Sequence, residues 1–128
     1  MSAEKIPVPT EFKERIVVER RPWGNFTSYP LEGTGSVKII TVDPGGMLSL
    51  QMHERRDEYW VVLDEGLEVT VGEKTWRPAP GEELWIQRGV KHRAKCIGDA
   101  PARFFELWLG WSDESDIVRL EDEYNRKE

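Results

Sequence analysis

The chain has 128 residues, of which 24 are Asp or Glu and 18 are Lys or Arg, so its formal net charge is −6 and its pI is about 5.1. This length predicts a single domain with its own core, and the acidic balance argues against a nucleic-acid partner, which proteins hold mainly through cationic contacts to phosphates. The longest runs without a charged residue, 22–31 and 44–53, have ten residues each and are too short for a membrane span.

The chain has one cysteine, Cys96, so it has no intrachain disulfide. Its first fourteen residues lack the apolar segment that a secretory signal peptide carries. A lone cysteine without a signal peptide is typical of proteins in a reducing compartment. We therefore expect the protein in the cytoplasm.

Residues 1–14 contain two prolines and few apolar side chains, and we expect them to form an arm. From residue 15 to about 110, short alternating segments are separated by turn residues at intervals of roughly 8–12 residues, which is the spacing of a sandwich or barrel. The expected strands are 36–42, 47–52, 58–63 and 67–71, followed by the segments KTWRP, ELWIQ, HRAKC and ARFFELWL.

Residues 111–128 are expected to form a short helical or extended segment after the barrel. For a helix, Ser115 or Asp116 is a suitable N-cap, and Ile117, Leu120 and Tyr124 would share one face.

About ten short strands predict an all-β fold. Closing the strands into a barrel or a double-sheet jelly roll leaves few open sheet edges. Because such barrels often hold a ligand in their mouth, candidate site residues are sought at strand ends.

Two histidines, His53 and His92, each lie at the end of an expected strand. Strand alternation places His53 and Arg55 on one face, and Glu58 opens the next strand with Trp60 on the same face. Two imidazoles and one carboxylate form a set that binds a divalent transition metal and leaves open positions. The sequence therefore indicates His53, Glu58 and His92 as candidate metal ligands.

The segments around the two histidines resemble the two sequence motifs of the cupin superfamily. His53 and Glu58 match the first motif, and the spacing of Gly81, Gly89 and His92 matches the second. This resemblance implies a double-stranded β-helix, the jelly-roll barrel of cupins.

A more specific resemblance is to the type II mannose-6-phosphate isomerase domain, which in bifunctional enzymes follows a mannose-1-phosphate guanylyltransferase domain. It covers roughly residues 18–126 and implies the interconversion of mannose 6-phosphate and fructose 6-phosphate in carbohydrate or polysaccharide precursor metabolism. The chain has no Gly-rich nucleotide loop and no room for the guanylyltransferase domain, so we expect neither a nucleotide cofactor nor nucleotidyl transfer. The matching segments are RPWG (21–24), LSLQMH (48–53), GVKHR (89–93) and DIVR (116–119).

Arg55 stands where the first cupin motif has its second histidine. Arginine keeps its positive charge in proteins, and that charge repels a nearby cation. Two outcomes follow. Either His53, Glu58 and His92 still bind a metal more weakly while Arg55 binds an anionic substrate, or Arg55 pairs with Glu58 in place of the metal.

A basic cluster lies next to His92, with Arg88 and Lys91 in the loop before it. A rim of this charge attracts a phosphorylated ligand. We therefore take Arg88, Lys91 and Arg55 as candidate substrate-binding residues, and add Trp60 because it shares the face of Glu58.

Three functions fit these residues. The first is a sugar-phosphate isomerase with a divalent metal (Zn, Mn, Fe or Ni) at the three ligands and Glu58, His92 and Arg55 as catalytic residues. The second is a non-catalytic, sugar-binding or regulatory cupin, and the third is another metal-dependent cupin such as an Fe(II) oxygenase. We expect an anionic sugar phosphate as ligand, a homodimer, and no membrane or nucleic-acid partner.

Overall fold

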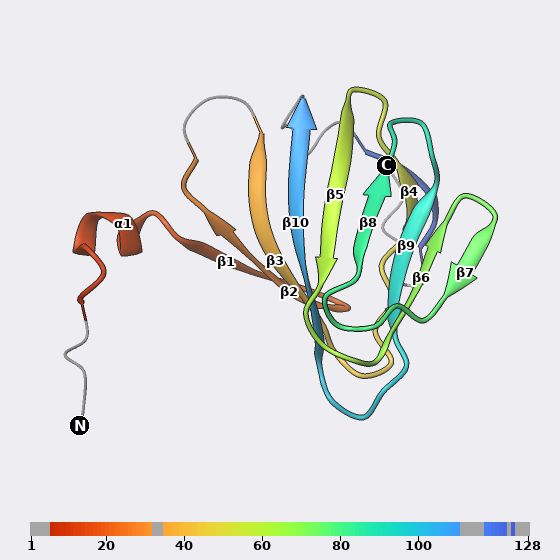
Figure 1. Ribbon diagram of the computed structural model, residues 1–128, viewed down its shortest axis with the longest axis horizontal. Helices are drawn as coiled ribbons and strands as arrows, with labels where there is room; N and C mark the ends of the chain where they lie inside the picture. The colour runs from red at the N-terminus through yellow and green to blue at the C-terminus, as the bar shows by residue number, and fades with distance from the viewer. Residues whose placement is uncertain (1–5, 32–34, 111–116, 123, 125–128) are drawn as a thin grey trace.

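The computed structural model describes residues 6–31, 35–110, 117–122 and 124. Eleven strands and one short helix lie in these ranges, and the strands form two antiparallel sheets that face each other (Figure 1). The all-β, double-sheet barrel expected from the sequence is therefore confirmed.

The larger sheet has six strands. Their spatial order differs from their chain order because β10 lies between β3 and β5, so a strand from the end of the barrel closes the middle of the sheet. In spatial order the strands are β1 (Val17–Arg21), β2 (Gly24–Tyr29), β3 (Ser36–Val42), β10 (Ala102–Gly110), β5 (Arg56–Val62) and β8 (Glu83–Ile86).

The smaller sheet has five strands, and its central strand β9 pairs with β4 on one side and β6 on the other. In spatial order the strands are β11 (Val118–Glu121), β4 (Leu50–Met52), β9 (His92–Cys96), β6 (Leu67–Val71) and β7 (Lys74–Trp76).

Strict alternation of burial along β3, β5 and β10 gives the larger sheet one inner face. Toward one end this face is apolar, with Trp60 stacked on Phe104 at a centroid distance of 4.1 Å. Toward the other end the inward positions carry polar side chains, because Lys38, Arg56 and Glu106 follow the same alternation and are buried. The interior of the barrel is therefore divided into a packed core and a polar end.

The arm contains a helix that the sequence did not indicate, α1 (Thr10–Glu14). It has no buried residue and lies away from the barrel in Figure 1. The helix of the described part of the chain is far too short and polar to cross a membrane.

The helix considered after residue 111 is wrong for residues 118–121, which form β11 and pair with β4. The alternative of an extended segment holds there, since backbone pairing to an existing sheet edge outweighs the weak helical period. The proposed N-caps, Ser115 and Asp116, lie outside the described residues. The expected strand over 47–52 is also shorter than predicted, because only Leu50–Met52 joins the sheet as β4.

Candidate metal centre and its cavity

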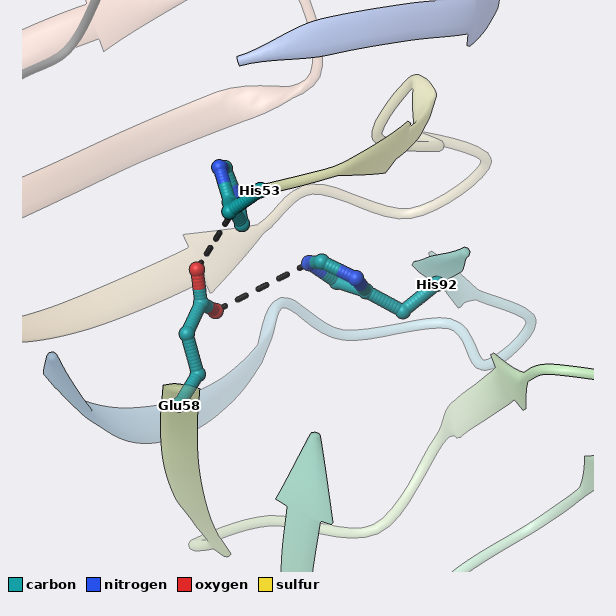
Figure 2. A group of neighbouring side chains, drawn as sticks. All are labelled: His53, Glu58 and His92. Carbon is teal, nitrogen blue, oxygen red and sulfur yellow. Dashed lines mark ion pairs between the residues drawn. The ribbon is translucent and has the colours of Figure 1, made fainter. Parts of the chain in front are cut away.

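The structure brings His53, Glu58 and His92 together in the interior (Figure 2). His53 follows β4, Glu58 is the third residue of β5, and His92 is the first residue of β9. One potential ligand atom from each lies within 4.8 Å of the others, and all three side chains are buried. The spatial cluster predicted from the sequence is therefore present, and its occupation by a metal stays a prediction.

His92 presents a bare nitrogen to the carboxylate of Glu58. Its Nδ1 lies 3.1 Å from the carbonyl oxygen of Val90, and since a carbonyl only accepts, Nδ1 carries the proton. Its Nε2 lies 3.7 Å from Glu58 Oε1 and makes no hydrogen bond to any described residue. Burial lowers the pKa of His92, so this imidazole is neutral, which is the form that binds a metal.

Glu58 is ionised despite its complete burial. Burial alone would raise its pKa, but the contacts with His53 and His92 and the positive charge of Arg56 outweigh it and hold the pKa well below its usual range. Trp60 Nε1 also donates to Glu58 Oε1 at 2.9 Å.

The donor set fits a divalent transition metal. A neutral imidazole nitrogen without a hydrogen bond and a buried carboxylate oxygen face each other as two acceptors, and a cation is the species that satisfies both. His53 adds a second imidazole, with Nε2 2.8 Å from Glu58 Oε2. The three residues together supply the N and O ligands that Zn, Mn, Fe and Ni accept.

The arginine beside this cluster is Arg56, and this corrects the role expected for Arg55. The side chain of Arg55 is exposed, whereas Arg56 is 3% exposed. Arg56 Nε donates to Glu58 Oε2 at 3.1 Å, and its Nη2 lies 3.1 Å from His53 Nε2. A bend at residues 54 and 55 interrupts the strand alternation between β4 and β5. The inward or outward position of residues after the bend therefore cannot be counted from His53.

A cavity of about 590 Å³, counted out to its open mouth, adjoins this cluster and has His53 in its wall. Four basic side chains line it, and they come from four different strands: Arg21 on β1, Lys38 on β3, Arg56 on β5 and Arg119 on β11. The lining favours an anionic ligand.

Aromatic rings hold several of these cations in place. Arg56 Cζ lies 3.2 Å and Lys38 Nζ 4.0 Å from the ring centroid of Trp108. The centroid of the His53 ring lies 6.5 Å from the same indole. Trp108 therefore connects the cationic lining to the histidine side of the cavity.

Among the described residues that line the cavity, Glu106 carries the one carboxyl group. Trp108 Nε1 donates to its Oε1 at 2.6 Å. Burial raises its pKa well above the usual range, and the negative charge of Glu58 adds to this effect against the opposing charge of Lys38. The surroundings of Glu106 therefore favour its protonated form.

Three predicted substrate residues lie outside the cavity lining. Trp60 is fully buried and packs against Phe104 in the core. Arg88 forms a two-pronged ion pair with Asp57 at the surface. Lys91 Nζ lies 3.1 Å from a carboxylate oxygen of the exposed Glu73. Arg88 and Lys91, which lie next to His92 in the sequence, are therefore part of the solvated surface.

Arg21, Lys38, Arg119 and Glu106 were missed from the sequence. One indication was available, because Lys38 and Glu106 occupy inward positions of strongly alternating strands, where a charged residue is unusual. Arg21 and Arg119 lie in the RPWG and DIVR segments that carry the family resemblance, but strand alternation did not mark them as inward residues, and they reach the cavity through the pairing of β1 and β11 with their sheets.

Two facing antiparallel sheets with a His, Glu and His cluster inside define a cupin. The cupin domain of Schizosaccharomyces pombe Cnp3 has the same fold, with a TM-score of 0.63 over 80% of this chain and 81% of that chain at 14% identity. More specifically, the family described as mannose-6-phosphate isomerase C-terminal matches residues 10–122, and the chain belongs to that family.

Two curated relatives agree with this assignment. The xanthan biosynthesis protein XanB of Xanthomonas campestris pv. campestris is 43% identical over 107 residues, which are 83% of this chain and 23% of XanB. The alginate biosynthesis protein AlgA of Pseudomonas aeruginosa is 40% identical over 107 residues, 83% of this chain and 22% of AlgA. The chain thus spans about a quarter of the length of these relatives, which act in polysaccharide biosynthesis.

Proposed function

We propose that the chain is a sugar-phosphate isomerase that interconverts mannose 6-phosphate and fructose 6-phosphate. The observation that carries the proposal is a His, Glu and His cluster adjoining a cavity lined by four cations, in a chain of the mannose-6-phosphate isomerase C-terminal family. A substrate with one phosphate and several hydroxyl groups matches a cavity of this charge.

His53, Glu58 and His92 would hold a divalent metal, which when bound supplies Lewis-acid polarisation of substrate oxygens. Val90 fixes the tautomer of His92 through its carbonyl, and Trp60 orients the carboxylate of Glu58. Such supporting hydrogen bonds hold metal ligands in a productive orientation.

The isomerisation removes a proton from C2 and returns one to C1, while a hydroxyl proton moves from the oxygen of C2 to that of C1. The reaction therefore needs a group in the cavity that accepts and returns a proton. In its ionised form Glu106 is suited to this task, because it lines the cavity, is oriented by Trp108, and has a raised pKa, which makes its carboxylate a stronger base. Its buried position keeps bulk water from exchanging the proton freely.

A second candidate is a sugar-binding cupin without catalysis. It is favoured by Arg56, whose guanidinium lies at 3.1 Å from both Glu58 Oε2 and His53 Nε2 and so neutralises the carboxylate without a metal. A binding module would keep the cationic cavity and lose turnover.

The deciding experiment is a coupled isomerase assay with mannose 6-phosphate on chelated protein and after addition of Zn²⁺, Mn²⁺, Co²⁺ or Fe²⁺. Metal-dependent turnover that is lost in Glu106→Gln supports the isomerase. Saturable binding of mannose 6-phosphate without turnover under every metal condition supports the binding module instead.

A further inference from the structure

We propose that Lys38, together with Arg21 and Arg119, forms a binding site for a phosphate monoester group. The three side chains line one cavity and come from β3, β1 and β11, strands that lie far apart in the sequence. The identity of the sugar attached to the phosphate rests on the proposed function, whereas the anion site itself does not.

Lys38 is the buried member of this anion site, with a relative exposure of 6%. Its ammonium nitrogen lies 4.0 Å from the ring centroid of Trp108 and 4.4 Å from that of Phe26. Aromatic faces attract a cation. The two rings therefore hold the ammonium group of Lys38 in the cavity wall.

The charges around the cavity do not sum to zero. Its described lining contains Arg21, Lys38, Arg56 and Arg119 but one carboxyl group, that of Glu106. Even if Glu106 is counted as ionised and the neighbouring Glu58 is included, two positive charges remain. A phosphate monoester near neutral pH carries close to two negative charges and therefore matches this excess.

Arg21 and Arg119 provide the geometry that a phosphate needs. Planar guanidinium groups donate two parallel hydrogen bonds to phosphate oxygens. Arg21 Cζ lies 4.9 Å from the Phe26 centroid, and its Nη2 is 3.6 Å from Glu19, a pair that is half exposed and thus screened. Arg56 is assigned elsewhere, because its guanidinium is engaged by Glu58 and His53.

This assignment differs from the one that the sequence suggested. Arg88 and Lys91 carry their charge at the surface and pair with Asp57 and Glu73 outside the cavity. Arg21, Lys38 and Arg119 share one cavity instead, and aromatic rings support Arg21 and Lys38 there.

The test is isothermal titration of the full chain with inorganic phosphate, mannose 6-phosphate and mannose. The variants are Lys38→Gln, Lys38→Arg, Arg21→Gln and Arg119→Gln. Matched controls are Arg20→Gln, the exposed neighbour of Arg21 on β1, and Lys74→Gln on the exposed strand β7. Circular dichroism and urea unfolding establish that each variant is folded.

We expect phosphate and mannose 6-phosphate to bind about tenfold more weakly to each Gln variant, as the loss of a hydrogen bond to a charged group predicts. Lys38→Arg should retain most of the affinity, both controls should bind like the wild type, and the affinity for mannose should not change. Since Arg21 and Arg119 are only partly buried, their variants remain informative if Lys38→Gln fails to fold.

Unchanged phosphate affinity in folded Arg21→Gln and Arg119→Gln proteins would overturn the proposal. The outcome is separable from that of the proposed function. If phosphate binding depends on Lys38 but no turnover is found, the isomerase proposal is refuted and the anion-site proposal is retained. If turnover is found and its KM is unchanged in the Lys38, Arg21 and Arg119 variants, the anion-site proposal is refuted and the isomerase proposal is retained.

Discussion

The Nε2 atom of His92 faces Glu58 Oε1 at a distance of 3.7 Å, with both side chains 1% exposed. Neither atom carries a proton to share, because His92 Nδ1 donates to Val90 and Glu58 is ionised. Glu58 Oε1 accepts from Trp60 Nε1, but no proton lies between it and His92 Nε2, and two buried acceptors that face each other in this way define a position suited to a cation.

We therefore predict that the chelated protein binds one equivalent of Zn²⁺ or Mn²⁺ and that His92→Ala and Glu58→Gln weaken the affinity at least tenfold. Removing even a supporting group of a metal site has an effect of about 10–100-fold, and these residues would be ligands. Titration calorimetry and metal analysis after dialysis provide the measurement. Glu54→Gln, an exposed carboxylate in the adjoining bend, is the matched control and should bind metal normally. Equal affinity in all four proteins would contradict the site.

The adjacent arginines Arg55 and Arg56 should differ strongly in their effect on stability. Arg56→Ala leaves Glu58 buried without its guanidinium partner, and breaking a buried ion pair in this way costs about 3–5 kcal/mol. Arg55→Ala alters an exposed side chain and should change the free energy of unfolding by less than about 0.5 kcal/mol. Urea unfolding of metal-free protein measures both. Similar losses of unfolding free energy for the two variants would contradict the inward position of Arg56 and the outward position of Arg55.

Glu106 should make the folded state less stable as the pH rises. Its folded pKa lies well above the unfolded value of 4.5, so above pH 4.5 the unfolded chain releases a proton that the folded chain keeps. Stability is then full below pH 4.5 and falls by up to about 1.4 kcal/mol per pH unit until the folded pKa is reached.

Glu106→Gln removes this ionisation, so its stability relative to the wild type should increase with pH. The measurement is the difference in unfolding free energy between the two proteins from pH 5 to 8 in the presence of a chelator. Taking the difference cancels the contribution of His92, whose lowered pKa acts with the opposite sign below pH 6.5. A difference that does not vary with pH would refute the prediction.

Gly24 should tolerate no side chain. It has a φ of +150°, and a Cβ atom there would clash with the carbonyl oxygen of Thr41 on β3, which precedes Val42, the partner of Gly24 in the sheet. We expect Gly24→Ala to cost at least about 3 kcal/mol, the upper end of what backbone strain alone contributes. Gly81→Ala is the control, because Gly81 also has a positive φ of +88° but a Cβ atom there would meet nothing within 4 Å. It should lose only about 1–2 kcal/mol, as thermal or urea unfolding will show.

The sequence alone determined the all-β barrel and the three residues of the candidate metal cluster. Alternating apolar residues and turn residues are local features, and the spacing of His53, Glu58 and His92 matches the cupin motifs that the sequence resembles. The tertiary structure decided which cations face the cavity. Because of a bend, Arg56 and not Arg55 faces the cavity. Arg21 and Arg119 reach the cavity through strand pairings between distant parts of the chain. Periodicity is counted along one strand, so it is lost at a bend and carries no information about which strands become neighbours.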